Sequence, residues 1–323
     1  MKKVRVALIG HGHLGRWHAQ KAHQIEKSEL VAIVEPNREA WSTIQSEYPH
    51  AQVVASVDEV MGQIDAAIIA TPTSLHANLL AKLLENKKHV FCEKPVVANA
   101  SELTLVDPFI DQSVLENKLI VQVGHSERCH EAWSFLENYQ DDINNFKMVK
   151  MNRLGAFKGR ATDVDVVADL MIHDIDLMLW IFKQRPITVS AIGEKMRTGL
   201  WDYACAEFKF PDLRKVVLTV GRNHTHEVRD FELVSKAGTL RVDLLNQKFG
   251  YAASQESDPE KFVLERGYQR RDHLLLEQES FYDSILEQKA PMVSYGDGAI
   301  AVKYLDCVLE ALNSPTNQEV RLP

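Results

Sequence analysis

The chain has 323 residues, of which 45% are hydrophobic and 25% charged, with a formal net charge of −8 and a pI near 5.9. This length allows two domains, and the composition is that of an ordinary globular protein. The acidic balance argues against a broadly basic, phosphate-tracking surface, and therefore against a nucleic-acid-binding protein.

Targeting signals are not expected in this sequence. The apolar run near the N-terminus is short and is interrupted by Arg5, so it does not resemble a signal peptide. No stretch approaches the ~20 apolar residues of a membrane span. The four cysteines lie far apart without a C-x-x-C pair, which is typical of free thiols in a reducing compartment. We therefore expect a cytoplasmic protein.

A glycine-rich loop follows the first apolar run, Val4 to Ile9, and precedes a helical pattern. The continuous apolar run indicates a buried strand. In such a G-x-G-x-x-G loop, the first glycine allows a tight turn, the second lets a pyrophosphate approach, and the third lets helix and strand pack closely. A strand before the loop and a helix after it predict a dinucleotide site. The predicted cofactor contacts are Gly10, His11, Gly12, His13 and Leu14.

Glu35 follows the second apolar run, Leu30 to Val34. It lies about 20–25 residues after the glycine loop, where an acid hydrogen-bonds the ribose hydroxyls of the adenosine. An acid at this position repels a 2′-phosphate, so NAD is expected in preference to NADP. Arg38 is a complication, because an arginine can pair with that phosphate. The alternative for Glu35 is a capping or loop carboxylate.

Two further apolar strands, 66–70 and 89–92, complete a repeated strand–helix rhythm. Ser56–Glu59 forms a capping box that opens a short helix. The rhythm predicts a parallel sheet with right-handed crossovers, which binds ligands beyond the carboxyl ends of its strands. The residues expected there as cofactor contacts are Thr71, Pro72, Thr73, His76, Glu93 and Lys94. Local turn chemistry also explains the threonines, and a surface ion pair would explain Glu93 with Lys94.

The first domain is expected to end at residue 123. A helical pattern over 100–118 contains Pro108, which predicts a break or a kink. The apolar run 119–123 is one more strand, and Gly124 marks the boundary. We therefore predict a Rossmann domain over 1–123 and a second α/β domain over 124–323.

One helix of the second domain carries polar residues in an apolar setting. Asp169, His173 and Asp176 are spaced by four and three residues, so they share one helix face. Two carboxylates and an imidazole are costly to bury without partners or a task. The alternatives are a catalytic group, a core histidine satisfied by a neighbouring carboxylate, and a metal site. No other ligand pattern supports a metal, and none is expected.

The remaining elements are mostly strands. The runs 147–154 and 216–220 are predicted strands, and Arg222, His224 and His226 alternate as if on one strand face. His-x-His can ligate a metal or form a polar sheet face. Residues 235–247 predict a hairpin, 251–260 a polar loop, and 274–287 and 299–312 closing helices.

Four motifs together resemble the glucose–fructose oxidoreductase/inositol dehydrogenase (Gfo/Idh/MocA) family. They are Gly10–Gly15, Ala70–His76, Glu93-Lys94-Pro95 and Asp169–Asp176, in the family's order. The resemblance implies a Rossmann domain with a parallel sheet, followed by an α/β domain with an open, mostly antiparallel sheet. It also implies a nicotinamide cofactor, a sugar or cyclitol substrate, and a homodimer or homotetramer formed through that open sheet.

Three segments are similar to one branch of this family, the UDP-N-acetylglucosamine 3-dehydrogenases. They are 123–128, 163–177 and 244–247. The resemblance implies oxidation of the sugar 3-hydroxyl before transamination in lipid A precursor synthesis. Cys129-His130-Glu131 replaces the Phe-Asn-Pro that is common in the family after this arginine. The alternatives for Arg128 are a role at the cofactor side of the cleft and a structural ion pair. Residues expected at the substrate are Lys94, His125, Arg153, Arg160, Asp169, His173 and Arg222.

The resemblance also suggests a mechanism. A secondary alcohol loses hydride to the nicotinamide while neutral His173 takes the hydroxyl proton, since an imidazole titrates near neutral pH. Asp169 holds the imidazole, and Lys94 stabilises the developing alkoxide or is itself the base. The three arginines, at 153, 160 and 222, are expected to meet a diphosphate, with surface or interface ion pairs as the alternative. Competing functions are an inositol or hexose dehydrogenase and a non-catalytic NAD-binding sensor.

Overall fold

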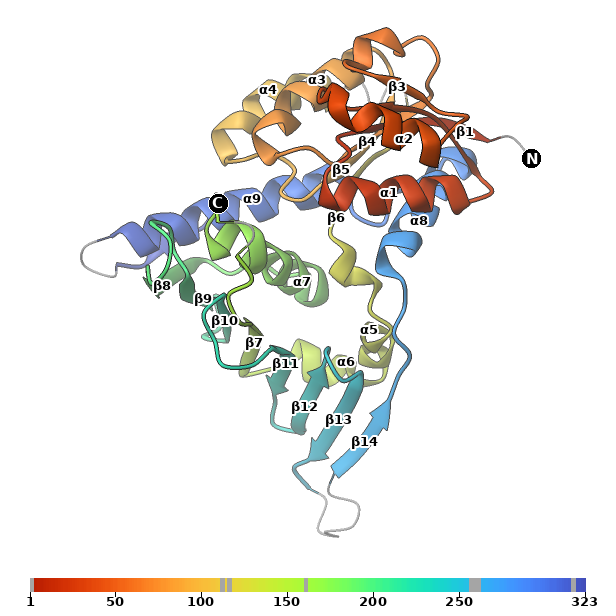
Figure 1. Cartoon of the computed structure of the whole chain (residues 1–323). Helices are drawn as coiled ribbons and strands as arrows, with labels where there is room; N and C mark the ends of the chain where they lie inside the picture. The colour runs from red at the N-terminus through yellow and green to blue at the C-terminus, as the bar shows by residue number, and fades with distance from the viewer. Residues whose placement is uncertain (1–2, 111–113, 115–117, 160–161, 256–262, 315–317) are drawn as a thin grey trace. The chain divides into compact units, whose positions relative to one another are not determined.

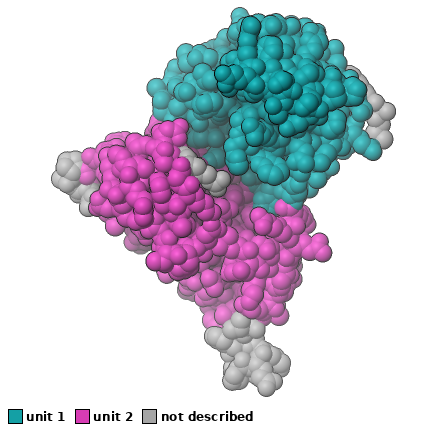
Figure 2. All heavy atoms as spheres, viewed as in Figure 1, with its two compact units in different colours: residues 1–126, 272–302 teal, residues 127–271, 303–323 magenta. Residues whose placement is uncertain are grey.

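A computed structural model describes residues 3–110, 114, 118–159, 162–255, 263–314 and 318–323. The chain forms two compact units, teal and magenta in Figure 2: residues 1–126 with 272–302, and residues 127–271 with 303–323. Each unit is built around its own β-sheet (Figure 1). A search of the described residues finds no helix whose length and apolar character would let it cross a bilayer.

The first unit contains a six-stranded parallel sheet with the order β3-β2-β1-β4-β5-β6. The order runs outward from β1 in both directions, so the chain reverses between β1 and β4, where such sheets bind ligands. This confirms the predicted Rossmann arrangement. The strands are β1 (Val4–Ile9), β2 (Ser28–Val34), β3 (Gln52–Val54), β4 (Ala66–Ile69), β5 (His89–Glu93) and β6 (Val121–Gly124).

Helices cover both faces of this sheet because alternate residues of each buried strand point to opposite sides. Val6 and Leu8 of β1 pack in one apolar cluster with residues of α1 and α8, whereas Ala7 and Ile9 pack in a second with α3, α4 and α9. The helices are α1 (His13–Gln24), α2 (Trp41–Glu47), α3 (His76–Glu85), α4 (Leu103–Ile110), α8 (His273–Glu287) and α9 (Tyr295–Asn313), whose last part belongs to the second unit.

Residues 272–302 return to the first unit, although the predicted boundary assigned them to the second domain. The reason is packing: Phe281 and Tyr282 of α8 are fully buried in the cluster beside β1. Burying an aromatic side chain of this size stabilises a fold by about 1.5–3 kcal/mol. The chain also passes between the units after Ser126 rather than after Val123.

The second unit contains a nine-stranded sheet with the order β14-β13-β12-β11-β7-β10-β9-β8-β15. Only the β7–β10 pair is parallel among these neighbours, which confirms the predicted mostly antiparallel sheet. The strands are β7 (Met148–Leu154), β8 (Thr188–Glu194), β9 (Tyr203–Lys209), β10 (Lys215–Gly221), β11 (Val228–Val234), β12 (Gly238–Asp243), β13 (Lys248–Ala253), β14 (Val263–Gly267) and β15 (Val320–Arg321).

One face of this sheet is buried and the other is partly exposed. Along β9, Ala204, Ala206 and Phe208 are buried while the residues between them are half-buried, as expected for a sheet with a single covered face. Ile192 of β8 is 61% exposed. The unit's helices are α5 (Ala132–Phe135), α6 (Gln140–Asn144), α7 (Ile172–Phe182) and the end of α9. A π-helical turn, Val167–Met171, leads into α7.

Local expectations were wrong at two places and in part at a third. Helix α4 continues through Pro108 to Ile110, so the chain is not broken there, while the alternative of a kink stays a prediction. The predicted polar loop 251–260 begins as part of β13, which pairs with β14; residues 256–260 lie outside the described residues. His224 and His226 do not lie on a strand, because β10 ends at Gly221.

Candidate active site

The glycine loop joins β1 to α1 and has the geometry of a phosphate cradle. Gly10 has φ +92°, and a Cβ there would lie 2.8 Å from the Ala70 carbonyl oxygen. A Cβ on Gly15 would lie 2.1 Å from the Gly10 carbonyl oxygen, so only glycine allows the helix to pack this closely. A Cβ on Gly12 would meet nothing within 4 Å, which leaves the backbone there open to a ligand.

The N-terminus of α1 is prepared for an anion. The helix begins at His13, its N-cap Gly12 provides no side-chain cap, and its first turn carries no acid. Uncapped N–H groups and the helix dipole both favour a phosphate at such a position. The open Gly12 backbone and the uncapped turn therefore fit the pyrophosphate of NAD.

Glu35 directly follows β2 and contacts the glycine loop. Its Oε2 accepts a hydrogen bond from the His11 backbone N–H at 3.2 Å, and its Oε1 accepts one from Asn37 N–H at 2.9 Å. These bonds orient the carboxylate beside the loop, so capping and ribose recognition are compatible roles rather than alternatives. Arg38 is exposed and lies over the ring of Trp41 at 5.5 Å from its centroid, which holds its guanidinium in a cation–π contact.

The other predicted residues of the loop differ in exposure. His11 is buried, its ring Nε2 has no hydrogen-bond partner among the described residues, and burial lowers its pKa. His13 and Leu14 are exposed at the start of α1. An orphaned buried imidazole nitrogen within the glycine loop is a polar atom for which a bound cofactor could provide a partner.

His76 connects the two loops that follow β4 and β5. Its Nε2 lies 3.0 Å from the Thr71 carbonyl oxygen and its Nδ1 lies 2.8 Å from the Pro95 carbonyl oxygen. The residue is 1% exposed, and burial lowers its pKa. Both ring nitrogens therefore face carbonyl oxygens of these loops, and the cofactor contact predicted for His76 stays a prediction. Thr71 and Thr73 are half-buried, Pro72 is exposed, and Thr71 Oγ1 has no partner among the described residues.

Lys94 follows the end of β5 and precedes Pro95 through a cis peptide bond. Its backbone N–H donates to Glu93 Oε2 at 3.2 Å. The Glu93 carboxyl turns inward, where its Oε1 lies 2.7 Å from His18 Nε2. A Cβ on Gly124 would lie 2.9 Å from that same Oε1, so the glycine at the end of β6 makes room for the carboxyl. Of this pair, Lys94 is half-buried and Glu93 is buried.

In the second unit, Asp169 lies in the π-helical turn and His173 in the first turn of α7. Asp165 precedes them, and its Oδ1 accepts a hydrogen bond from Ala168 N–H at 2.8 Å. Asp169 and Leu170 line a cavity of about 100 Å³. The cavity wall also contains cationic side chains from β7, β10 and β11 and the loops beside them: Arg153, Lys158, Arg222 and Arg229.

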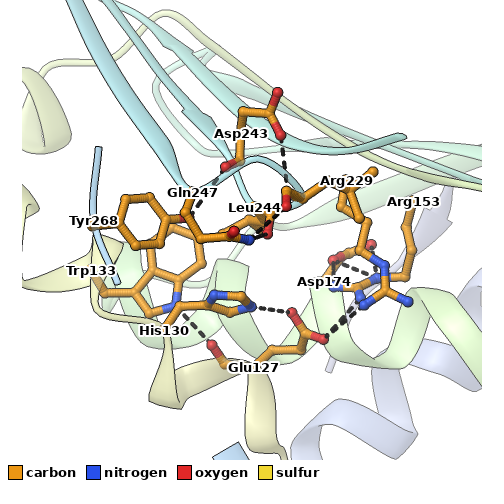
Figure 3. A network of polar contacts seen from close by, with 11 residues as sticks. Glu127, His130, Trp133, Arg153, Asp174, Arg229, Asp243, Leu244, Gln247 and Tyr268 are labelled. Carbon is orange, nitrogen blue, oxygen red and sulfur yellow. Dashed lines mark hydrogen bonds and ion pairs between the residues drawn. The ribbon is translucent and has the colours of Figure 1, made fainter. Parts of the chain in front are cut away.

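A buried ionic network lies beside this cavity (Figure 3). The Glu127 carboxylate lies between His130 Nε2, at 3.2 Å, and Arg153 Nη1, at 3.0 Å. Arg153 also donates to Asp174 Oδ1 at 2.7 Å. Burial opposes ionisation of Glu127, but Arg153 and His130 hold its pKa well below the usual value. Arg229 contacts the network more loosely, at 3.8 Å from Glu127.

Two of the arginines predicted for a diphosphate are thus already paired. Arg153 is buried between two carboxylates, and Arg222 donates to Asp202 Oδ1 at 2.7 Å and to the Val164 carbonyl at 2.8 Å. Arg128 forms a bidentate pair with Asp176, at 2.8 and 2.5 Å. This pair favours the ion-pair alternative for Arg128. Asp176 is fully buried in that pair.

Two further residues, His125 and Arg160, were also predicted at the substrate. His125 is buried in the first unit, and Arg160 lies outside the described residues. His224 Nδ1 lies 2.9 Å from the His226 carbonyl oxygen in a turn after β10.

Sequence reasoning missed two buried acids, Glu127 of the ionic network and Glu277 of α8. Glu277 had a detectable signal: it shares a helix face with Phe281 and Ser284, which are four and seven residues later, so a carboxyl lies in the buried stripe of α8. Glu127 had no comparable periodic signal, because it lies in a short turn at 126–129.

Two regions of the chain match family models. Residues 4–125 match an oxidoreductase family with an NAD-binding Rossmann fold, and residues 145–241 match the GFO/IDH/MocA C-terminal domain. Among curated proteins, the UDP-N-acetylglucosamine 3-dehydrogenase of Acidithiobacillus ferrooxidans is 34% identical over 246 residues, which cover 76% of each chain. The inositol 2-dehydrogenase of Rubrobacter xylanophilus is 26% identical over 347 residues, covering 99% of this chain and 94% of that protein.

Solved structures agree with these matches. The structure of the Acidithiobacillus ferrooxidans UDP-N-acetylglucosamine 3-dehydrogenase is similar with a TM-score of 0.86 and 28% identity, covering 97% of this chain and 98% of that chain. The scyllo-inositol dehydrogenase of Lactobacillus casei, solved with NAD(H) and scyllo-inositol, has a TM-score of 0.83 and 22% identity, covering 99% of both chains. The second similarity shows a shared fold.

Proposed function

The chain belongs to the GFO/IDH/MocA oxidoreductase family, and from this premise we propose that it oxidises the 3-hydroxyl of UDP-N-acetylglucosamine with NAD⁺. The family is one of NAD-binding dehydrogenases, so the enzyme class and the cofactor follow from membership. The observation that carries the choice of sugar is the 34% identity with the UDP-N-acetylglucosamine 3-dehydrogenase of Acidithiobacillus ferrooxidans.

Cofactor binding is assigned to the first unit. The open backbone at Gly12 and the first turn of α1 receive the pyrophosphate, and Glu35 accepts hydrogen bonds from the ribose hydroxyls. A carboxylate held beside the glycine loop repels a 2′-phosphate, which supports NAD over NADP. Bound NAD⁺ supplies the hydride acceptor.

Catalytic roles are assigned to His173, Asp169 and Lys94. Neutral His173 takes the proton of the reacting hydroxyl, since an imidazole titrates near the working pH. Asp169, one turn earlier in the chain, orients that imidazole. Lys94 donates a hydrogen bond to the reacting oxygen and stabilises its developing negative charge.

The diphosphate of the substrate requires cations that are not already neutralised. Arg153 and Arg222 already form ion pairs with buried carboxylates. We therefore assign the diphosphate-binding role to Arg229, whose side chain lines the cavity and is 45% exposed. Burial and the neighbouring Arg153 lower the pKa of Arg229, so a negative group beside it would be favoured.

An inositol is the second candidate substrate. The supporting observation is that relatives named inositol 2-dehydrogenase match nearly the whole chain, at 24–26% identity over 98–99% of it. Inositols carry no phosphate, so this candidate gives Arg229 no anionic partner. The two candidates therefore predict different effects of removing that charge.

Kinetics with a substrate panel test the proposal. Nicotinamide absorbance is followed with NAD⁺ or NADP⁺ and UDP-N-acetylglucosamine, UDP-glucose, myo-inositol or glucose. We expect NAD⁺ reduction with UDP-N-acetylglucosamine, and a rise in its KM of about 10–100-fold in Arg229→Ala, since a hydrogen bond to a charged group contributes about 1.5–3 kcal/mol. Arg241→Ala is the matched control, because Arg241 is an exposed arginine of β12 paired with Asp230.

Other outcomes of this panel reassign the function. Turnover with myo-inositol alone, unaffected by Arg229→Ala, would favour the second candidate. Bound NAD⁺ without reduction by any panel member would contradict both and favour a sensor.

Self-association is proposed for the uncovered face of the nine-stranded sheet. Alternate residues of β9 and β10 on that face are half-buried rather than buried, and Ile192 of β8 is exposed. A second copy of this sheet would cover such a face, giving a homodimer or homotetramer. Light scattering of the purified protein measures the assembly, and a monomer would contradict the proposal.

A further inference from the structure

A buried polar cluster in the first unit adjoins the Glu93–Lys94 segment. It consists of His18 from α1, Glu93 from β5, and Glu277 and Gln278 from α8, all of them buried. Ligand atoms of His18, Glu93 and Glu277 all lie within 4.8 Å of one another. Two carboxyls this close cannot both be ionised without water or cations between them.

We propose that this cluster holds one negative charge, on Glu93, and that Glu277 is kept as a neutral acid that positions the Glu93–Lys94 segment. Glu277 thereby acts on the reaction through Glu93 and Lys94. The protonation of Glu277 is a property of the first unit alone. Only the kinetic consequence rests on the role proposed above for Lys94.

The hydrogen bonds of Gln278 assign the tautomer of His18. Gln278 Nε2 lies 3.2 Å from the His18 carbonyl oxygen, which can only accept, so this amide atom is the donor. The same Nε2 lies 2.8 Å from His18 Nδ1, and Nδ1 must therefore be unprotonated. His18 then carries its proton on Nε2 and donates it to Glu93 Oε1 at 2.7 Å.

Glu93 is the member that carries the charge. Its carboxylate accepts hydrogen bonds from His18 Nε2–H and from the Lys94 backbone N–H. Burial opposes ionisation, but the hydrogen bond from His18 and the charge of Lys94 lower the pKa of Glu93. An acceptor-only group with these donors is stable as a carboxylate.

Glu277 has the opposite environment. It is 2% exposed, and neither carboxyl oxygen has a hydrogen-bond partner among the described residues. Burial, followed by the nearby carboxylates of Glu93 and Asp272, raises the pKa of Glu277 well above its usual value. Lys21 does not offset this, because it pairs with Asp272 at 2.8 Å. A neutral acid, in contrast, needs no cation and brings a donor of its own.

The side chain of Gln122 offers an acceptor for the carboxyl proton of Glu277. Gln122 Nε2 donates to the Glu277 carbonyl oxygen at 2.7 Å, and Gln122 Oε1 is buried without a donor among the described residues. A protonated carboxyl supplies the missing kind of group, directly or through a buried water.

A divalent cation is the competing explanation for three ligand-type residues this close together. A metal would need a free lone pair on His18 Nε2, but this nitrogen carries the ring proton and donates it to Glu93. If the proton moved to Nδ1, it would point at the hydrogens of the Gln278 amide. The hydrogen bonds therefore favour a proton over a metal.

Infrared spectroscopy tests the proposal without any substrate. We expect wild-type protein at pH 7 to show the C=O band of a buried protonated carboxyl, and Glu277→Gln to lose it. Glu279→Gln is the matched control on the same helix and should retain the band. Absence of the band from wild type, or its persistence in Glu277→Gln, would overturn the proposal. So would a stoichiometric divalent metal in wild type that Glu277→Gln lacks.

A pH profile tests the effect on Lys94. Ionisation of Glu277 would add a second buried charge beside Glu93, so wild-type kcat/KM should fall tenfold per pH unit above the folded pKa of Glu277. Glu277→Gln should lack this limb. If the infrared band behaves as expected and the two profiles coincide, the positioning role is refuted while the neutral acid stands. Failure of the substrate panel leaves the infrared result unaffected.

Discussion

Replacing Glu277 with Gln should make the protein more stable at neutral pH. Glutamate in an unfolded chain has a pKa of about 4.3, whereas burial raises the pKa of Glu277 in the folded protein. Between these two values the folded state binds one more proton than the unfolded state, so stability falls as pH rises. Each pH unit costs about 1.4 kcal/mol. Up to the folded pKa the wild type therefore loses stability that a glutamine, which does not titrate, retains.

Urea denaturation at several pH values between 4 and 8 measures this difference. Titrating groups outside this cluster are shared by the two proteins, so their contributions cancel when the unfolding free energies are subtracted. The advantage of Glu277→Gln should grow with pH from about pH 4 until the folded pKa is reached. Glu279→Gln should give a curve parallel to wild type. A constant difference between Glu277→Gln and wild type would refute the neutral acid.

Four other substitutions test the site. Lys94→Met and His173→Ala should each lower turnover by about 10²–10⁴-fold while NAD⁺ still binds, because proton transfer and alkoxide stabilisation typically contribute this much. The control is Lys82→Met, since Lys82 is an exposed lysine paired with Asp58. Near-normal turnover of either variant would remove that residue from the mechanism. Gly15→Ala should weaken NAD⁺ binding and lower the melting temperature, since its Cβ would collide with a backbone oxygen at 2.1 Å, and unchanged calorimetry would contradict the packing argument. Arg153→Met should lower the free energy of unfolding by about 3–5 kcal/mol in urea denaturation, because it leaves two buried carboxylates without their cation. A loss below 1 kcal/mol would mean that this arginine does not stabilise the network.

The cofactor loop could be predicted because its requirements are local. Gly10, Gly12 and Gly15 are needed by one turn and by the helix that follows directly, so their spacing is visible in the sequence. Glu35 was predictable for the same reason, since it immediately follows a strand whose apolar run is continuous. The repeated strand–helix rhythm also predicted the parallel sheet, whereas the mostly antiparallel sheet was expected from the family resemblance.

The buried clusters could not be predicted, because their partners are distant in sequence. His18 and Gln278 are 260 positions apart, and no pattern within α1 or α8 identifies the other. Arg153 was predicted to bind a substrate phosphate, but its buried partners, Glu127 and Asp174, come from a turn and a helix that the sequence does not connect to β7. A basic residue near a predicted cavity does not reveal whether its charge is already neutralised.

Turns that follow strands were misread for a related reason. His224 and His226 alternate as strand residues do, yet β10 ends at Gly221. The Arg222 N–H still donates to the Asp202 carbonyl oxygen in register with β9, whereas the His224 N–H donates to the Gly155 carbonyl oxygen. Side-chain alternation over a few residues cannot show where the backbone pairing of a strand ends.

Transfer of deuterium from carbon 3 of the sugar tests the central claim most directly. The enzyme is given UDP-N-acetylglucosamine labelled with deuterium at that carbon, with NAD⁺, and the reduced cofactor is analysed by mass spectrometry. We expect NADH that carries the deuterium, together with slower turnover than with unlabelled sugar. NADH without the label would show that another carbon is oxidised, and no NADH at all would contradict the proposed substrate.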